Sequence, residues 1–218
     1  AASLSNLAGL YCTQGRYEQA EPRYLQALEL ARALLGSNHP NVALCLNNLA
    51  GLYHAQERYK QAESRYIQAL QIGIQALGEE HPNVVVGLNN FAELYQALKR
   101  YAEAEPLYLQ ALSICDQQLG QAHPYTQRTL QAFADFLSQV KQSDRLSELS
   151  DDPMTRSLLG SFASRRVRSL ESSDRTNLTS TIKTNAIGVH HESIRVSSPN
   201  HRRWQTRTIR CCIAKRPH

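Results

Sequence analysis

The sequence predicts an all-α protein whose first two-thirds form an α-solenoid of repeated helix pairs, followed by a poorly ordered tail. Three observations support this fold class. A block of 42 residues recurs, with 25 identities between residues 1–42 and 43–84, and a period of this length is typical of repeat arrays. Apolar residues within each block recur at helical spacing. Both features disappear after residue 140, so we expect the array over residues 1–140 and the tail over residues 141–218.

Each repeat is expected to contain two helices. In the second copy, the first helix is predicted over residues 41–56 on apolar positions at helical spacing, namely Leu46, Leu49, Ala50 and Tyr53. A longer second helix is predicted over residues 59–77, with one stripe formed by Tyr59, Ala62, Tyr66, Ala69 and Leu70. Gly15 lies between the helices in the first copy, which suits a helix end that needs a left-handed residue. Glu57 and Lys99 replace it in the next copies, so the turn does not require glycine.

The repeats are separated by a glycine that ends the long helix and a His-Pro pair that starts the next one. Proline suits the first position of a helix because its φ is already set and it needs no amide hydrogen. The three instances are Gly36, His39 and Pro40; Gly78, His81 and Pro82; and Gly120, His123 and Pro124. They predict repeats over residues 1–40, 41–82 and 83–124, with a partial copy over residues 125–140.

This pattern resembles the tetratricopeptide repeat. The resemblance rests on Leu-Asn-Asn-Leu-Ala-Gly-Leu-Tyr in the first helix, Arg-Tyr-x2-Ala-Glu-x2-Tyr-x2-Ala-Leu in the second, and Leu-Gly-x2-His-Pro-Asn-Val between repeats. The 42-residue form is similar to the repeats of kinesin light chains, and many bacterial proteins carry similar ones. The resemblance implies seven helices, or three and a half repeats, in a right-handed superhelix. Ala1 aligns with Ala43, inside a first helix, so we expect a fragment of a longer protein.

In a tetratricopeptide array, one face of each first helix lines a concave groove. Here the groove is expected to carry a row of polar side chains, Ser5, Asn47, Asn89 and Gln131, which can pair with the backbone of an extended peptide. Neighbouring groove positions are Cys12, His54, Gln96, Glu93, Asp135 and Arg128. Exposed polar residues that only solvate the helices are the alternative interpretation. These groove positions include two acidic residues, Glu93 and Asp135, and only Arg128 and His54 as basic ones. A ligand rich in acidic residues is therefore disfavoured.

The resemblance implies a protein–protein interaction scaffold that binds extended peptide segments. Two variants stay open, a cargo or adaptor protein similar to kinesin light chains and a bacterial scaffold. The partner is therefore expected to be a protein or peptide, with a kinesin heavy chain or a signalling protein among those the resemblance implies. No small-molecule substrate is expected.

No catalytic or metal-binding constellation is apparent. The sequence has no phosphate-binding glycine loop, nucleophile elbow or paired catalytic carboxylates, so no enzyme activity and no cofactor are expected. His39, His81 and His123 occur once per repeat and cannot meet around one metal ion. The spacing of the five cysteines matches neither a zinc site nor a disulfide framework, which favours a reducing cytoplasm. The sequence contains no run of about 18 apolar residues, so no membrane-spanning helix is expected.

The tail differs from the array in charge and composition. Residues 1–150 carry 11 basic and 14 acidic residues, a net charge of −3, whereas residues 151–218 carry 13 and 5, a net charge of +8. Seventeen of these 68 tail residues are Ser or Thr, a composition that favours disorder. Basic clusters at residues 165–168 and 201–204 suggest an alternative function, weak binding of nucleic acid or acidic surfaces. A reading-frame shift after about residue 140 is a second explanation for this change, and the sequence alone does not separate it from a genuine tail.

Overall fold

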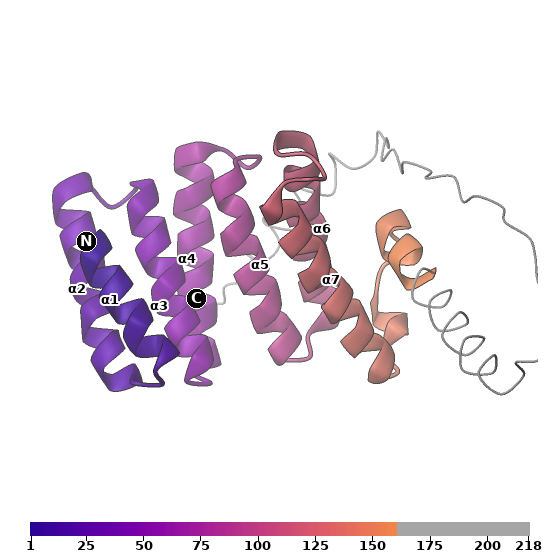
Figure 1. Cartoon of the computed structure of the whole chain (residues 1–218), viewed down its shortest axis with the longest axis horizontal. Helices are drawn as coiled ribbons and strands as arrows, with labels where there is room; N and C mark the ends of the chain where they lie inside the picture. Colours follow the sequence, from indigo (N-terminus) through magenta and orange to yellow (C-terminus); the bar gives the residue numbers. More distant parts are fainter. Residues whose placement is uncertain (161–218) are drawn as a thin grey trace, which may run out of the picture. The chain divides into compact units, whose positions relative to one another are not determined.

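The computed structural model describes residues 1–160. Its first unit contains residues 1–150 and is built from seven α-helices that run side by side in chain order (Figure 1). They are α1 (Ala2–Thr13), α2 (Tyr17–Leu35), α3 (Pro40–Ala55), α4 (Tyr59–Leu77), α5 (Pro82–Ala97), α6 (Tyr101–Gln118) and α7 (Pro124–Gln142). The predicted all-α solenoid of seven helices is confirmed. The predicted disorder concerns mostly residues 161–218, which lie outside the described residues.

The His-Pro pairs start the first helix of each later repeat. Proline occupies the first helical turn of α3, α5 and α7, and the preceding histidine caps the helix. The Nδ1 atom of His39 accepts a hydrogen bond of 3.1 Å from the amide of Asn41, and His81 and His123 make the equivalent bond. An imidazole acceptor thus satisfies one of the unpaired amides that every helix start exposes. These histidines therefore have a structural role.

The turn between the helices of a pair uses a left-handed residue. Gly15 has a φ of 71°, and Glu57 and Lys99 adopt nearly the same conformation with φ values of 59° and 57°. In each case the next amide returns to a carbonyl five residues back, as in the bond from Arg58 to Tyr53. This hydrogen bond satisfies an end carbonyl of the helix. Glu57 and Lys99 therefore accept strained backbone angles that glycine adopts freely.

Small residues allow the helices to pack closely, as the sequence predicts. Ala8, Ala50 and Ala92 on the first helices are fully buried, and so are their counterparts on the second helices, Ala20, Ala62 and Ala104. Each first helix also contacts the first helix of the next repeat, α1 with α3, α3 with α5 and α5 with α7. The first helices therefore form one layer, and α2, α4 and α6 pack against it.

The array closes beyond the predicted boundary at residue 140. Helix α7 continues to Gln142, and a short 3-10 helix follows at Leu146–Glu148. The backbone amide and hydroxyl of Ser150 donate to the two carboxylate oxygens of Glu105, at 2.6 and 2.9 Å. Residues 141–150, expected to belong to the tail, thus complete the array. In the second unit, residues 153–160 are helical.

Candidate peptide-binding groove

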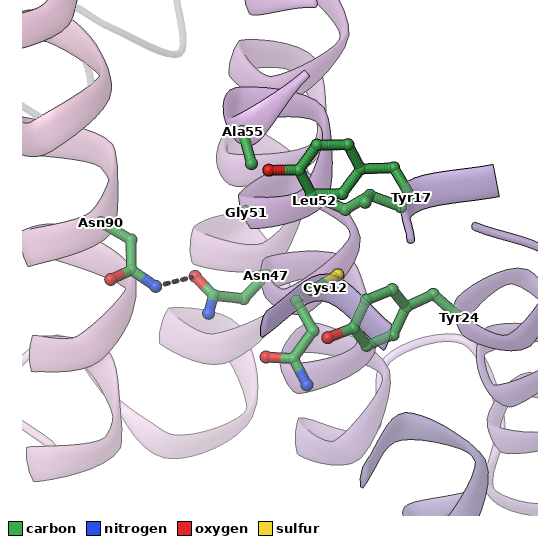
Figure 2. A pocket seen from close by; sticks show the side chains of 9 residues that line it. Cys12, Tyr17, Tyr24, Asn47, Gly51, Leu52, Ala55 and Asn90 are labelled. Carbon is green, nitrogen blue, oxygen red and sulfur yellow. Dashed lines mark hydrogen bonds between the residues drawn. The ribbon is translucent and has the colours of Figure 1, made fainter. Parts of the chain in front are cut away.

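A pocket opens on the layer of first helices. Its volume is about 240 Å³, and it is lined by residues of α1, α2, α3 and α5: Cys12, Tyr17, Tyr24, Asn47, Asn48, Gly51, Leu52, Ala55 and Asn90. Figure 2 shows their side chains around the opening. We call the face of α1, α3, α5 and α7 that carries this pocket and the predicted row Ser5, Asn47, Asn89 and Gln131 the groove face.

Two tyrosine hydroxyls from the second helices lie near glycines of the first helices, where a Cβ atom would make an ordinary van der Waals contact. A Cβ atom on Gly9 would lie 3.5 Å from the hydroxyl oxygen of Tyr24, and one on Gly51 would lie 3.7 Å from that of Tyr66. Burial and the neighbouring Cys12 raise the pKa of Tyr24 to about 12, so its hydroxyl stays protonated at neutral pH. The tyrosine at the pocket can therefore both donate and accept a hydrogen bond.

The predicted polar row links adjacent first helices. Asn47 is only 7% exposed, and its Oδ1 atom accepts a hydrogen bond of 3.3 Å from Nδ2 of Asn90 (dashed in Figure 2). Asn89 donates to Oγ1 of Thr129 at 2.7 Å, and the hydroxyl of Ser5 lies 3.9 Å from the sulfur of Cys45. The first three members of the row are therefore at least partly engaged within the array.

The end of the row is more open. Gln131 is exposed and donates to Asp135 at 2.8 Å along the same helix, α7. Asn89 keeps one unused group, because its Oδ1 atom accepts no hydrogen bond from any described residue. Such an unpaired buried acceptor is uncommon in proteins. The four residues of the row therefore differ in how many of their hydrogen-bonding groups are already engaged within the array.

Four of the remaining predicted residues lie toward α5 and α7. Gln96 accepts a hydrogen bond of 3.0 Å from the hydroxyl of Tyr108 and donates to Gln139 at 2.5 Å. Burial raises the pKa of Glu93, and the charge of Arg128 opposes this shift. Arg128 and Asp135 are exposed, and Glu93 is also exposed to solvent although neighbouring protein atoms partly desolvate its carboxylate. This end of the groove face thus carries two acidic groups and one basic group.

The last two predicted residues lie on α1 and α3. Cys12 lines the pocket, and burial raises the pKa of its thiol although a contact with Tyr24 lowers it. A thiol with a raised pKa is a poor nucleophile at neutral pH. Burial lowers the pKa of His54, which favours its neutral form. The pocket end of the groove face is therefore uncharged.

Sequence reasoning missed the two asparagines that border the pocket beside the predicted row. Asn48 and Asn90 occupy the same register in successive repeats, as does the exposed Asn6. The recurrence of this asparagine is evident from the sequence and helped to define the repeat, but it did not predict a place in the pocket. A side chain one residue from the predicted row points about 100° around the helix, and only the packing of α1, α2, α3 and α5 brings both Asn47 and Asn48 to the pocket.

Other kinds of site have no support in the described part of the chain. In residues 1–160, no three His, Cys, Asp or Glu side chains come together as a metal site would require. Within the same range, no helix has both the length and the apolar character needed to cross a bilayer. The basic clusters behind the alternative function lie at residues 165–168 and 201–204, beyond the described residues.

Comparison with known proteins gives one family and several similar folds. A family model for the tetratricopeptide repeat matches residues 1–75, 46–117 and 83–145. No curated protein sequence matches the chain.

Among solved structures, BtubC (BKLC) from P. vanneervenii is 22% identical, with a TM-score of 0.58 over 87% of this chain and 70% of that one. TPR-like repeats of Podosopora anserina, assigned to a kinesin light chain, are 21% identical, with a TM-score of 0.53 over 98% of this chain and 95% of that one. A point variant of those repeats, also 21% identical, gives a TM-score of 0.56 over 80% of this chain and 96% of that one. These likenesses establish a shared fold.

Proposed function

This chain belongs to the tetratricopeptide repeat family, and from that premise we propose that it is a non-catalytic scaffold that binds an extended peptide segment of a partner protein along its groove face. The proposal rests above all on the pocket, which draws its lining from four helices of three successive repeats. A ligand that enters it contacts several repeats at once. An extended segment has the shape to do so.

The amides around the pocket suit a peptide backbone. Each residue of an extended segment exposes an amide donor and a carbonyl acceptor that need partners once water is removed. Asn48 lines the pocket and can supply both kinds of group. Gly51 and Ala55 leave space beside these groups for a ligand side chain.

The charges favour a particular kind of segment. The pocket end of the groove face is uncharged, so it suits an apolar or neutral polar side chain. The other end carries Glu93 and Asp135 against Arg128 alone, so a ligand rich in acidic residues would be repelled there. We therefore favour a neutral or basic segment over an acidic one.

The proposed setting is the cytoplasm, and the partner is a protein. A cargo or adaptor role similar to that of kinesin light chains and a role as a bacterial scaffold both fit the proposal. The similar structures from Podosopora anserina and P. vanneervenii support these two variants. A kinesin heavy chain or a signalling protein is a partner of the kind these roles would use.

The experiment is capture of partners by the full chain, followed by mapping of the bound segments with a peptide array. Asn48→Ala should weaken capture by about tenfold, because it removes two hydrogen-bonding groups beside the pocket. Asn6→Ala is the matched control, since Asn6 has the same register but does not line the pocket. Gly51→Leu should block the pocket by filling it.

The proposal fails if Asn48→Ala and Gly51→Leu capture the same segments as strongly as the unmodified chain. Circular dichroism must show unchanged helicity in each variant. Asn47→Ala is a poor test because it also removes the bond to Asn90 within the array. Retained capture by a chain lacking residues 1–140 would instead assign binding to the tail.

A further inference from the structure

One register of the groove face changes from glycine to acid along the array. It contains Gly9 on α1, Gly51 on α3, Glu93 on α5 and Asp135 on α7. Gly51 lines the pocket, whereas the two acidic residues are exposed to solvent. A ligand that runs along this register from α3 to α7 therefore meets an uncharged pocket and then two carboxylates.

The hydroxyls of two buried tyrosines connect these positions. The hydroxyl oxygen of Tyr66 would lie 3.7 Å from a Cβ atom on Gly51, and its pKa is raised by burial and then by the charge of Glu93. Burial also raises the pKa of Tyr108, followed by the charges of Glu93 and Asp135. Glu93 thus lies close enough to act on both hydroxyls. We call Gly51, Glu93 and Asp135 the acidic strip.

The carboxylates of the acidic strip lack a close counter-charge. Within residues 1–160, neither Glu93 nor Asp135 forms an ion pair. Desolvation raises the pKa of Glu93 by more than the charge of Arg128 lowers it, and Asp135 accepts only a neutral hydrogen bond from Gln131. A cation that comes close to such a carboxylate stabilises its charged form. The strip therefore suits a ligand with positive side chains.

The pocket beside Gly51 holds a hydrogen-bond donor that the array does not use. Asn47 lines the pocket, is only 7% exposed and accepts a hydrogen bond from Asn90 through its Oδ1 atom. Its Nδ2 atom donates to no residue in the described range, and Figure 2 shows it without a bond to the residues around the pocket. An unused donor on so buried a side chain is uncommon. It indicates that a ligand supplies an acceptor here.

The distance between repeats sets how often a ligand must present a side chain to the strip. Helices in direct contact, as α3 is with α5 and α5 with α7, have axes about 8–10 Å apart. In a β-strand, side chains on one face recur about every 6.6 Å. In a polyproline II helix, which has three residues per turn, they recur about every 9.3 Å. Only the second period matches the spacing of the repeats.

We propose that the groove face binds a polyproline II segment that places an uncharged acceptor group in the pocket and a lysine or arginine at the third and sixth positions from it, one against Glu93 and one against Asp135. This inference rests on the proposed function, because it specifies the segment that the groove binds. Charge complementarity identifies the occupant. Its two cations meet the two carboxylates, and its neutral end meets the uncharged pocket.

The test uses the full chain and labelled synthetic peptides. The first peptide carries a glutamine, lysines three and six positions away from it, and proline at the positions between. A second peptide has the same composition but carries its lysines two and four positions from the glutamine, and a third replaces the two lysines of the first with glutamates. Each peptide is made in both chain directions, and fluorescence anisotropy measures the dissociation constants.

The first peptide, in one of its two directions, should bind about tenfold more tightly than the second, because only the three-residue spacing brings both lysines to the carboxylates. Glu93→Gln should weaken that binding about fivefold. The same substitution should have little effect on a peptide in which the lysine nearer the glutamine is replaced by glutamine, as expected when two groups interact directly.

Asp116→Asn is the matched control. Asp116 is an exposed carboxylate on α6, outside the layer of first helices, so its loss changes the net charge by the same amount and should leave binding unchanged. Glu93→Lys should reverse the preference in favour of the glutamate peptide. Circular dichroism checks that each variant keeps its helicity.

Equal affinity for the two lysine spacings would overturn the inference, as would equal weakening by Glu93→Gln and Asp116→Asn. Failure of every peptide to bind at millimolar concentration would also overturn it. The proposed function fails on a different result. If Gly51→Leu abolishes capture of partners but the lysine spacing has no effect, only the specified segment is wrong. If capture survives both Asn48→Ala and Gly51→Leu, the groove itself is not the binding site.

Discussion

Truncation of the same leucine in two successive repeats measures how much stability the stacking of repeats supplies. Leu7 and Leu49 are 42 residues apart and occupy the same register of α1 and α3. Leu49 is fully buried, whereas Leu7 is more than one-third exposed. Their sequence neighbours are identical from Asn6 to Tyr11 and from Asn48 to Tyr53. Any difference between the two truncations therefore comes from what packs against each helix.

Leu49→Ala should cost about 2–5 kcal/mol, the range for a fully buried leucine whose removal leaves a cavity. For an array of this size, each kcal/mol lowers the melting temperature by about 2–4 °C, so the midpoint should fall by roughly 4–20 °C. Leu7→Ala should cost about 1 kcal/mol, because less buried surface is lost and solvent reaches the space left behind.

The assay is thermal and urea unfolding of the two variants and the unmodified chain, followed by circular dichroism at 222 nm. Urea slopes show whether a variant changes the amount of surface exposed on unfolding. Equal losses of stability in the two variants would refute the reasoning, because burial by the neighbouring repeat would then contribute nothing. An unchanged midpoint for Leu49→Ala would show that this residue is not part of the core.

Three further predictions concern the turns, acid stability and alkaline stability. Glu57→Gly should stabilise the chain by about 0.5–1 kcal/mol in urea unfolding, because glycine relieves the left-handed strain that Gly15 already avoids; a loss of stability would contradict this. The hydrogen bond from Arg58 lowers the pKa of Glu21. The ion pair of Glu21 with Arg58 therefore contributes stability above the unfolded carboxyl pKa, and this stability is lost as pH falls through the folded pKa. Glu21→Gln should reduce the fall of the melting temperature between pH 5 and pH 3, and an unchanged pH profile would contradict this. Burial raises the pKa of Tyr24 to about 12, so the stability of the neutral phenol is complete below about pH 10 and is lost as pH rises toward 12; Tyr24→Phe should reduce the alkaline loss of the melting temperature, and the same loss in both proteins would argue against this origin.

Much of the fold could be predicted from the sequence because its determinants are local and occur three times. The glycine and the His-Pro pair define where helices end and begin, and the spacing of small and apolar residues defines the packed faces. The prediction was less accurate at the far end, where α7 and residues 143–150 continue the array past residue 140. Ser150 completes the array by donating hydrogen bonds to Glu105, which lies 45 residues earlier in the chain, and no local sequence pattern predicts that contact.

The groove was predicted only in part. Sequence register placed Asn47 and Asn89 on the first-helix face, but the structure shows that their side chains hydrogen-bond to residues of the next repeat. Those bonds join residues 43 and 40 positions apart in the chain, a pairing that the register of a single helix does not specify. The repeat register assigned Asn47 to the groove but not Asn48. Only the structure shows that both residues border the pocket.

The sequence by itself determined the repeat, the two helices in each unit and the residues that start and end them, because hydrogen bonding and packing within one unit are set by neighbours in the chain. Only the tertiary structure decided which residues of the same register are buried or form ion pairs and which are exposed. Arg16 and Arg58 both lie over a tyrosine ring. Only Arg58 also pairs with a glutamate of the preceding second helix, Glu21 on α2. The physical reason is that in a stacked array each repeat packs against its neighbours, so identical sequences acquire different burial and different charge pairing.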